Sequence, residues 1–129
     1  MAAKFKLVPA GTFKHTIEIP MAGTDELQKL QFTFKRLNTD QLKEVQKDFE
    51  AQMAELEEKY KNTALSATER DVLLRPMMID YIMKVAENWE LTEEFAPENL
   101  TVLLVNYPRA FEAISIQYQR ELWSIRQKS

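Results

Sequence analysis

The sequence predicts an α+β fold that is mainly α-helical, with four to five helices and an N-terminal antiparallel β-hairpin. Apolar and polar residues alternate in two stretches before residue 38, which is typical of half-buried strands. From residue 40 onward the apolar residues recur every three or four positions, which is typical of helices. We therefore expect a single domain over residues 1–129, with a β-hairpin region at 5–37 and a helical region at 38–129.

Two strands should form the hairpin, and Pro20 should end the first of them. The apolar side of the first strand consists of Phe13, His15, Ile17 and Ile19. The apolar side of the second consists of Leu30, Phe32 and Phe34. The stretch PMAGTDELQK between them is too long for a two-residue turn, so we expect a looser loop.

A long helix should begin at Asp40, with Asn38 or Thr39 as its N-cap. Its apolar stripe consists of Leu42, Val45, Phe49, Met53, Leu56 and Tyr60. The stripe is shorter than the three to four heptads that favour a free-standing coiled coil. It is therefore expected to pack against the rest of the chain or a sister subunit, and a client-binding face is the alternative.

A second helix should begin with the capping box SATE at positions 66–69 and continue to about Asn88. Pro76 lies inside it, and a proline there removes a backbone hydrogen bond and clashes with the preceding turn. We expect a kink or a break near Leu74 or Arg75, and two separate short helices are the alternative.

Two shorter helices should follow. Pro97 suits the first position of a helix, which makes Ala96 the N-cap and lets Phe95 pack on Leu100 as a hydrophobic staple. The helix should end at Asn106, because a proline at position 108 forces residue 107 into an extended conformation. The last helix should start at position 108, and its apolar face consists of Phe111, Ile114, Tyr118, Leu122 and Ile125.

Composition and charge exclude several kinds of partner. The net charge is -3 and basic residues are interleaved with acidic ones, so the chain offers no basic surface for nucleic acid. No run of roughly 20 apolar residues is present for a membrane crossing, and the first residues lack the apolar centre of a secretion signal. The absence of cysteine excludes disulfides and thiolate metal sites, and fits a reducing cytosol.

Candidate catalytic and metal-binding groups are few. His15 is the only histidine, and a lone histidine without cysteines makes a poor metal site. A group of glutamates surrounds Trp89 in the sequence: Glu87, Glu90, Glu93 and Glu94. Neither a glycine-rich loop nor an alternating ligand pattern accompanies them, which favours a solvated acidic corner. We expect no catalytic residues, no metal and no cofactor.

The order of these features resembles a known family. The chain has an opening hairpin with FKLVPAGTFKHTIEIP and FTFKRL, a helix ended by Trp89, and the segment FAPENLTVLLVNYPRAFEAISIQYQREL. Together they resemble the tail assembly chaperones of long-tailed bacteriophages, and the resemblance spans nearly the whole chain.

The resemblance implies a non-enzymatic protein in the cytoplasm of the infected bacterial host. Such proteins bind the tail tape measure protein, help recruit major tail tube subunits, and are absent from the mature virion. It also implies adaptable apolar surface and a homo-oligomer. A longer, frameshifted form exists for some members. A minor structural tail protein that stays in the virion is the alternative.

The expected partner-binding residues are large and apolar, and they come from the first two predicted helices and the residue after them: Phe49, Met53, Leu56, Met77, Met78, Met83 and Trp89. Methionines adapt to irregular surfaces, so the three methionines near Pro76 could form a soft groove for a partner helix. The competing interpretation is that these methionines fill the core. The competing interpretation of Trp89, and of Tyr107, is a structural role at the end of a helix.

Overall fold

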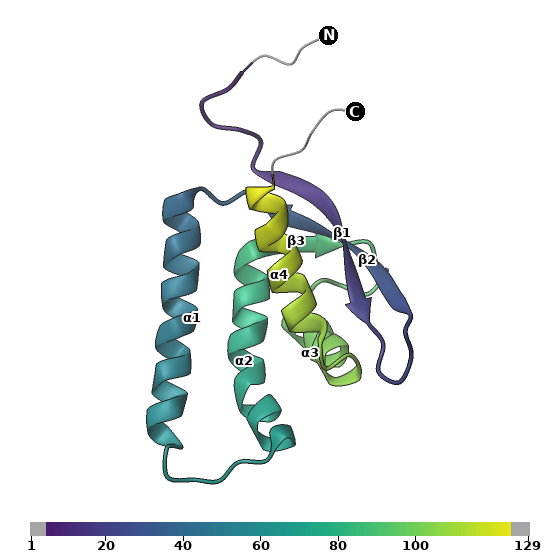
Figure 1. Ribbon diagram of the computed structural model, residues 1–129. Coiled ribbons are helices and arrows are strands. Elements are labelled where there is room, and N and C mark those ends of the chain that lie inside the picture. The colour runs from purple at the N-terminus through teal and green to yellow at the C-terminus, as the bar shows by residue number, and fades with distance from the viewer. Residues whose placement is uncertain (1–4, 125–129) are drawn as a thin grey trace.

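The computed structural model describes residues 5–124, and it confirms an α+β fold with an N-terminal β-hairpin (Figure 1). The elements in chain order are β1 (Thr12–Pro20), β2 (Leu27–Lys35), α1 (Thr39–Lys59), α2 (Ala67–Val85), β3 (Ala86–Trp89), α3 (Pro97–Asn106) and α4 (Ala110–Trp123). Figure 1 shows α2 and α4 between the sheet and α1, and the α1–α2 loop at the end of the molecule away from the start of β1 and the end of α4. Within residues 5–124, no helix has the length and apolar character to span a membrane.

The sheet has three antiparallel strands in the order β1-β2-β3. The predicted alternation is confirmed, because the pair Ile17 and Leu30 and the phenylalanines of β2 face the core. The loop between β1 and β2 spans residues 21–26, and Gly23 has a φ of 83° there. That backbone conformation favours glycine.

The third strand was not predicted, because the second helix was expected to reach Asn88. It ends at Val85 instead, and residues 86–89 pair with β2. The register shifts within this pair, since Phe32 lies opposite Trp89 and Phe34 lies opposite Ala86. One extra residue on β3 is a β-bulge, and it allows Ala86 and Trp89, three positions apart, to face the core together.

Aromatic rings fill the core between the sheet and the helices. Tyr118 of α4 is fully buried, and its ring centroid lies 4.9 Å from that of Phe34. The ring centroid of Trp89 lies 6.0 Å from Phe32 and 5.3 Å from Phe95. Pairs at these separations contribute about 0.5–1.5 kcal/mol each beyond their buried area. This core holds the sheet to α2, α3 and α4.

Both long helices start at the predicted caps. Asn38 caps α1 in a capping box with Gln41, and Ser66 caps α2 in a capping box with Glu69. The alternative of two short helices is wrong, because α2 continues through Pro76. Figure 1 shows the N-terminal turns of α2 bending away from the axis of the rest of the helix.

The last two helices follow the proline signals. α3 starts at Pro97 with Ala96 as its cap, and it ends at Asn106 as expected. α4 starts at Ala110 and not at Pro108, because residues 108 and 109 form a turn. The predicted apolar face of α4 is confirmed as far as Leu122, and Ile125 lies outside the described residues.

Candidate partner-binding surface

Helix α1 is the least buried part of the helical region. Of its residues only Leu42 is buried, with 5% of its surface exposed. The rest of the predicted apolar stripe is half-buried, from Val45 to Tyr60. Figure 1 shows the reason, because α1 stands at the outside of the molecule. Its apolar stripe is therefore only partly covered by the chain itself.

A groove of about 370 Å³ lies between α1 and α2 next to their connecting loop, and we call it the tip groove. Its apolar lining residues come from α1, the loop and α2: Met53, Leu56, Tyr60, Leu65, Leu73 and Leu74. Its charged lining residues are Glu57, Lys61 and Arg70. An apolar floor with charges of both signs at its edge suits the apolar face of an amphipathic helix.

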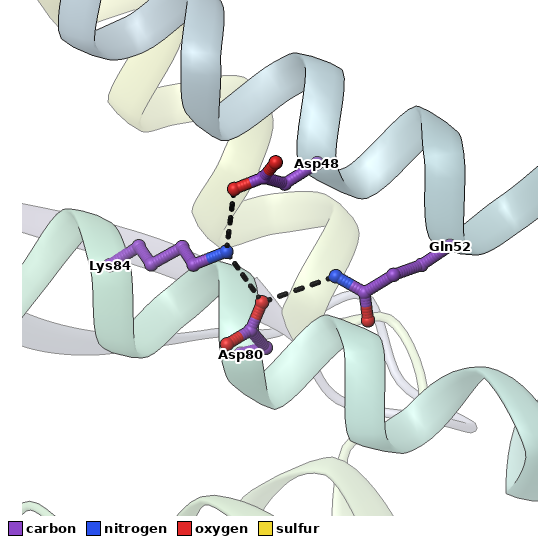
Figure 2. Close-up of polar contacts among 4 residues, drawn as sticks. All are labelled: Asp48, Gln52, Asp80 and Lys84. Atoms are coloured by element: carbon purple, nitrogen blue, oxygen red, sulfur yellow. Dashed lines mark hydrogen bonds and ion pairs between the residues drawn. The ribbon is translucent and has the colours of Figure 1, made fainter.

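A group of four polar side chains joins the middle of α1 to α2, and we call it the latch (Figure 2). The ammonium of Lys84 lies 2.9 Å from a carboxylate oxygen of Asp80 and 3.2 Å from one of Asp48. Gln52 donates a hydrogen bond of 3.2 Å to the same oxygen of Asp80. The latch thus connects Asp48 and Gln52 of α1 to Asp80 and Lys84 of α2.

The latch shifts the pKa values of its charged groups. The hydrogen bond to Asp80 is the main reason that the pKa of Lys84 is raised, and Asp48 adds to the effect. Burial alone would raise the pKa of Asp80, but the hydrogen bonds from Lys84 and Gln52 and the lysine charge lower it. Both shifts favour the charged forms, so the latch is an ion-pair network at neutral pH.

A second groove, of about 510 Å³, opens between α1 and α4. Its floor is aromatic, because the ring centroid of Phe49 lies 5.7 Å from Tyr81 and 5.6 Å from Phe111. Ile116 at its edge is 45% exposed. The tip groove and the aromatic groove therefore both take lining residues from the apolar stripe of α1.

The expected partner-binding residues separate into two groups. Met53 and Leu56 line the tip groove, and Phe49 lines the aromatic groove. Met77 and Trp89 are buried, with 3% and 5% of their surface exposed.

The other two methionines, Met78 and Met83, pack against the core and line neither groove. Trp89 lies in a strand and not at the end of a helix, and its indole nitrogen donates a 2.7 Å hydrogen bond to the carbonyl of Glu93. Met77, Met78, Met83 and Trp89 therefore lie in the core or pack against it.

Three residues that line the tip groove were not predicted: Leu65, Leu73 and Leu74. Leu65 lies in a loop outside any periodic pattern, while Leu73 and Leu74 fall in a helix that is apolar on several sides. One ion pair of the latch could have been predicted from the sequence, because Asp80 and Lys84 are four positions apart on one helix. Their partners on α1 depend on how the two helices pack.

The acidic corner is solvated as expected. Its four glutamates, at positions 87, 90, 93 and 94, are exposed, and one carboxylate oxygen of Glu90 accepts a 3.2 Å hydrogen bond from the backbone of Gln31. His15 lies 3.8 Å from a carboxylate oxygen of Glu121. Over residues 5–124, histidine and carboxylate side chains do not gather in groups of three or more that could hold a metal ion.

A family model described as phage tail assembly chaperone matches residues 1–129. No curated protein and no solved structure matches the chain significantly. The family match covers the hairpin, the latch and both grooves along α1.

Proposed function

Because this chain belongs to the phage tail assembly chaperone family, we propose that it binds the tail tape measure protein and keeps it soluble during assembly. It acts in the host cell during tail assembly, helps to bring major tail tube subunits onto the bound tape measure protein, and leaves before the virion is complete. The work is done by binding, and no bond is made or broken.

The tip groove is the observation that carries this proposal. A tape measure protein is expected to be a long helical chain with apolar stripes, which would aggregate if left uncovered. The tip groove offers apolar side chains from two helices, and charges of both signs beside them. Because α1 is held to α2 mainly by half-buried contacts and the latch, the groove can widen for helices of different shape.

Co-expression with the tape measure protein of the same phage tests the proposal. The wild-type chain should raise the soluble fraction of the tape measure protein. Leu73→Gln, inside the tip groove, should reduce this effect, because a polar side chain weakens an apolar contact. Val72→Gln is the matched control, since Val72 is the neighbouring residue, is 53% exposed and lies outside the groove.

Circular dichroism should show that both variants keep the helical content of the wild type. A tape measure protein that is equally insoluble with and without the chain would contradict the proposal. Mass spectrometry of purified particles tests the predicted departure from the virion. A chain retained in mature particles would instead support a minor structural tail protein.

A further inference from the structure

The outer edge of β1 has backbone groups without partners. The carbonyl of Gly11 faces β2 and accepts a hydrogen bond from Arg36, so the even-numbered residues of β1 direct their backbone groups away from β2. At Glu18 both of these groups are bonded to the side chain of Gln117. Three residues keep both groups without a hydrogen bond within residues 5–124: Thr12, Lys14 and Thr16. We call residues 12–16 the open edge.

The other edge of the sheet is less suited to an added strand. β3 has only four residues, and a β-bulge interrupts its pairing with β2. β1 has nine residues, and its register with β2 is regular from end to end. A regular edge with free N–H and C=O groups is the template to which an extended segment adds as a further strand.

The side chains of the open edge are basic, although the whole chain has a net charge of -3. Lys14 lies in the middle of it, and Lys35 lies opposite Thr12 on the same face of the sheet. Neither lysine forms an ion pair within residues 5–124. The one acidic residue of β1, Glu18, lies outside the open edge and opposite Lys29.

Helix α4 adds another cation beside β1. Arg120 lines a groove of about 290 Å³ together with Glu18 and Gln117, and it has no ion pair among the described residues. The neighbouring Glu121 lies at the inner face of the sheet, where its carboxylate is 3.8 Å from His15. Positive charge therefore dominates beside the open edge, which suits an occupant with acidic side chains.

Apolar side chains precede the strand. Three of them are almost fully exposed, at 91%, 92% and 82%: Phe5, Leu7 and Val8. They lead directly into β1, so an added strand that continues past Gly11 would cover them. Apolar area removed from water in this way favours binding.

We propose that the open edge binds an extended, acidic segment of another protein, which adds to the sheet as a fourth strand next to β1. This inference goes beyond the proposed function, because it does not depend on what fills the grooves along α1. The tip groove lies at the end of the molecule away from the start of β1 (Figure 1), so one chain can use both surfaces at once.

A second copy of the chain is a poor occupant. Two β1 strands that pair antiparallel through all three open residues place the two Lys14 side chains directly opposite each other. Like charges in directly opposite positions destabilise a sheet, whereas opposite charges stabilise it. The partner segment therefore carries an acidic residue where a second copy would carry Lys14.

Nuclear magnetic resonance of the full chain tests the proposal, with two short synthetic peptides as probes. Glutamate alternates with valine in the acidic peptide, and lysine alternates with valine in the basic control. At saturating acidic peptide, hydrogen exchange of the amides of Thr12, Lys14 and Thr16 should slow about tenfold, because these amides gain acceptors. The basic peptide should bind about fivefold more weakly or worse.

Two variants test the charge and the backbone separately. Lys14→Glu should weaken the acidic peptide about fivefold and strengthen the basic one. Lys47→Glu is the matched control, since Lys47 is an exposed lysine of α1 without an ion pair in residues 5–124. Thr16→Pro removes an amide that points away from β2, so the hairpin should persist while peptide binding is lost. Lys14→Glu carries the test on its own if Thr16→Pro does not fold.

Leu73→Gln, which alters the tip groove, should leave peptide binding unchanged, and this separates the open edge from the proposed tape measure site. Equal affinity for the two peptides, no binding of the acidic peptide, or slowed exchange only outside residues 12–16 would each overturn the proposal. A folded Thr16→Pro variant that binds as tightly as the wild type would overturn it as well.

Discussion

The side-chain amide of Gln117 on α4 takes the place of a neighbouring strand at Glu18 of β1. The backbone N–H of Glu18 donates a 2.9 Å hydrogen bond to Oε1 of Gln117, and Nε2 of Gln117 donates a 2.7 Å bond to the carbonyl of Glu18. β1 is an edge strand, and unpaired edges invite pairing with other chains. The Gln117 side chain therefore satisfies one position of this edge and ties α4 to the sheet.

We predict that Gln117→Ala lowers the free energy of unfolding by about 1–2 kcal/mol, because two hydrogen bonds to the backbone are lost. Urea denaturation followed by circular dichroism measures the change. Gln46→Ala is the control, since Gln46 is an exposed α1 residue with no hydrogen bond from its side chain in the described structure. Equal midpoints for the two variants would show that the two hydrogen bonds between Gln117 and Glu18 do not stabilise the fold.

The fold could be predicted where local signals are strong. Asn38, Ser66 and Pro97 each mark the start of a helix through their own backbone or side-chain chemistry, so all three starts were predicted. The strand β3 could not be predicted, because its sequence AENW does not alternate and suits the end of a helix. It is a strand only because β2 lies beside it, and the bulge that sets its side chains depends on that pairing.

Of the tip groove, only the wall formed by α1 could be predicted from the sequence. The periodicity of α1 places Met53 and Leu56 on one stripe, and both residues line the tip groove. The opposite wall depends on the angle at which α2 packs and on the loop that carries Leu65. Such packing relationships join residues that are distant in sequence, and no local pattern of the sequence predicts them.

The N-cap of α3 offers a stabilising substitution. Ala96 has an extended backbone, with φ -147° and ψ 158°, and it makes no side-chain capping bond. Ala96→Ser should raise the free energy of unfolding by roughly 1 kcal/mol, because a hydroxyl can accept a hydrogen bond from an unpaired amide of the first turn. Thermal unfolding measures the change. Ala54→Ser, at an exposed position inside α1, should not stabilise the protein, and a gain as large as that of Ala96→Ser would contradict the mechanism.

Because of the latch, the free energy of unfolding should depend on pH in the acidic range. Because the pKa of Asp80 in the folded state is lowered from 3.8, its contribution is present above that value and is lost as the pH falls through the folded-state pKa. Asp80→Asn should cost about 0.5 kcal/mol at neutral pH, since the pair is partly exposed. The difference from the wild type should shrink as the pH falls below 3.8.

Urea denaturation at a series of pH values measures the effect of Asp80→Asn. Asp25→Asn is its control, because Asp25 is an exposed loop residue with no ion pair among residues 5–124. A difference between wild type and Asp80→Asn that stays constant from neutral to acid pH would show that the ion pairs of the latch do not stabilise the fold.

Tyr118 should make the protein sensitive to alkali. Burial, and after it the charge of Tyr81, raises the pKa of Tyr118 from 10.0 to about 12, and its hydroxyl donates a 2.9 Å hydrogen bond to the carbonyl of Lys35. A raised folded-state pKa means that the stability is fully present below pH 10.0 and is lost as the pH rises through about 12, since the unfolded chain ionises first.

Tyr118→Phe should lose about 1 kcal/mol at neutral pH, because the carbonyl of Lys35 loses its donor. It should also show a shallower loss of stability between pH 10 and 12 than the wild type. Denaturation midpoints over this pH range measure both effects, and parallel curves for the two proteins would rule out the buried Tyr118 hydroxyl as the cause of alkaline unfolding.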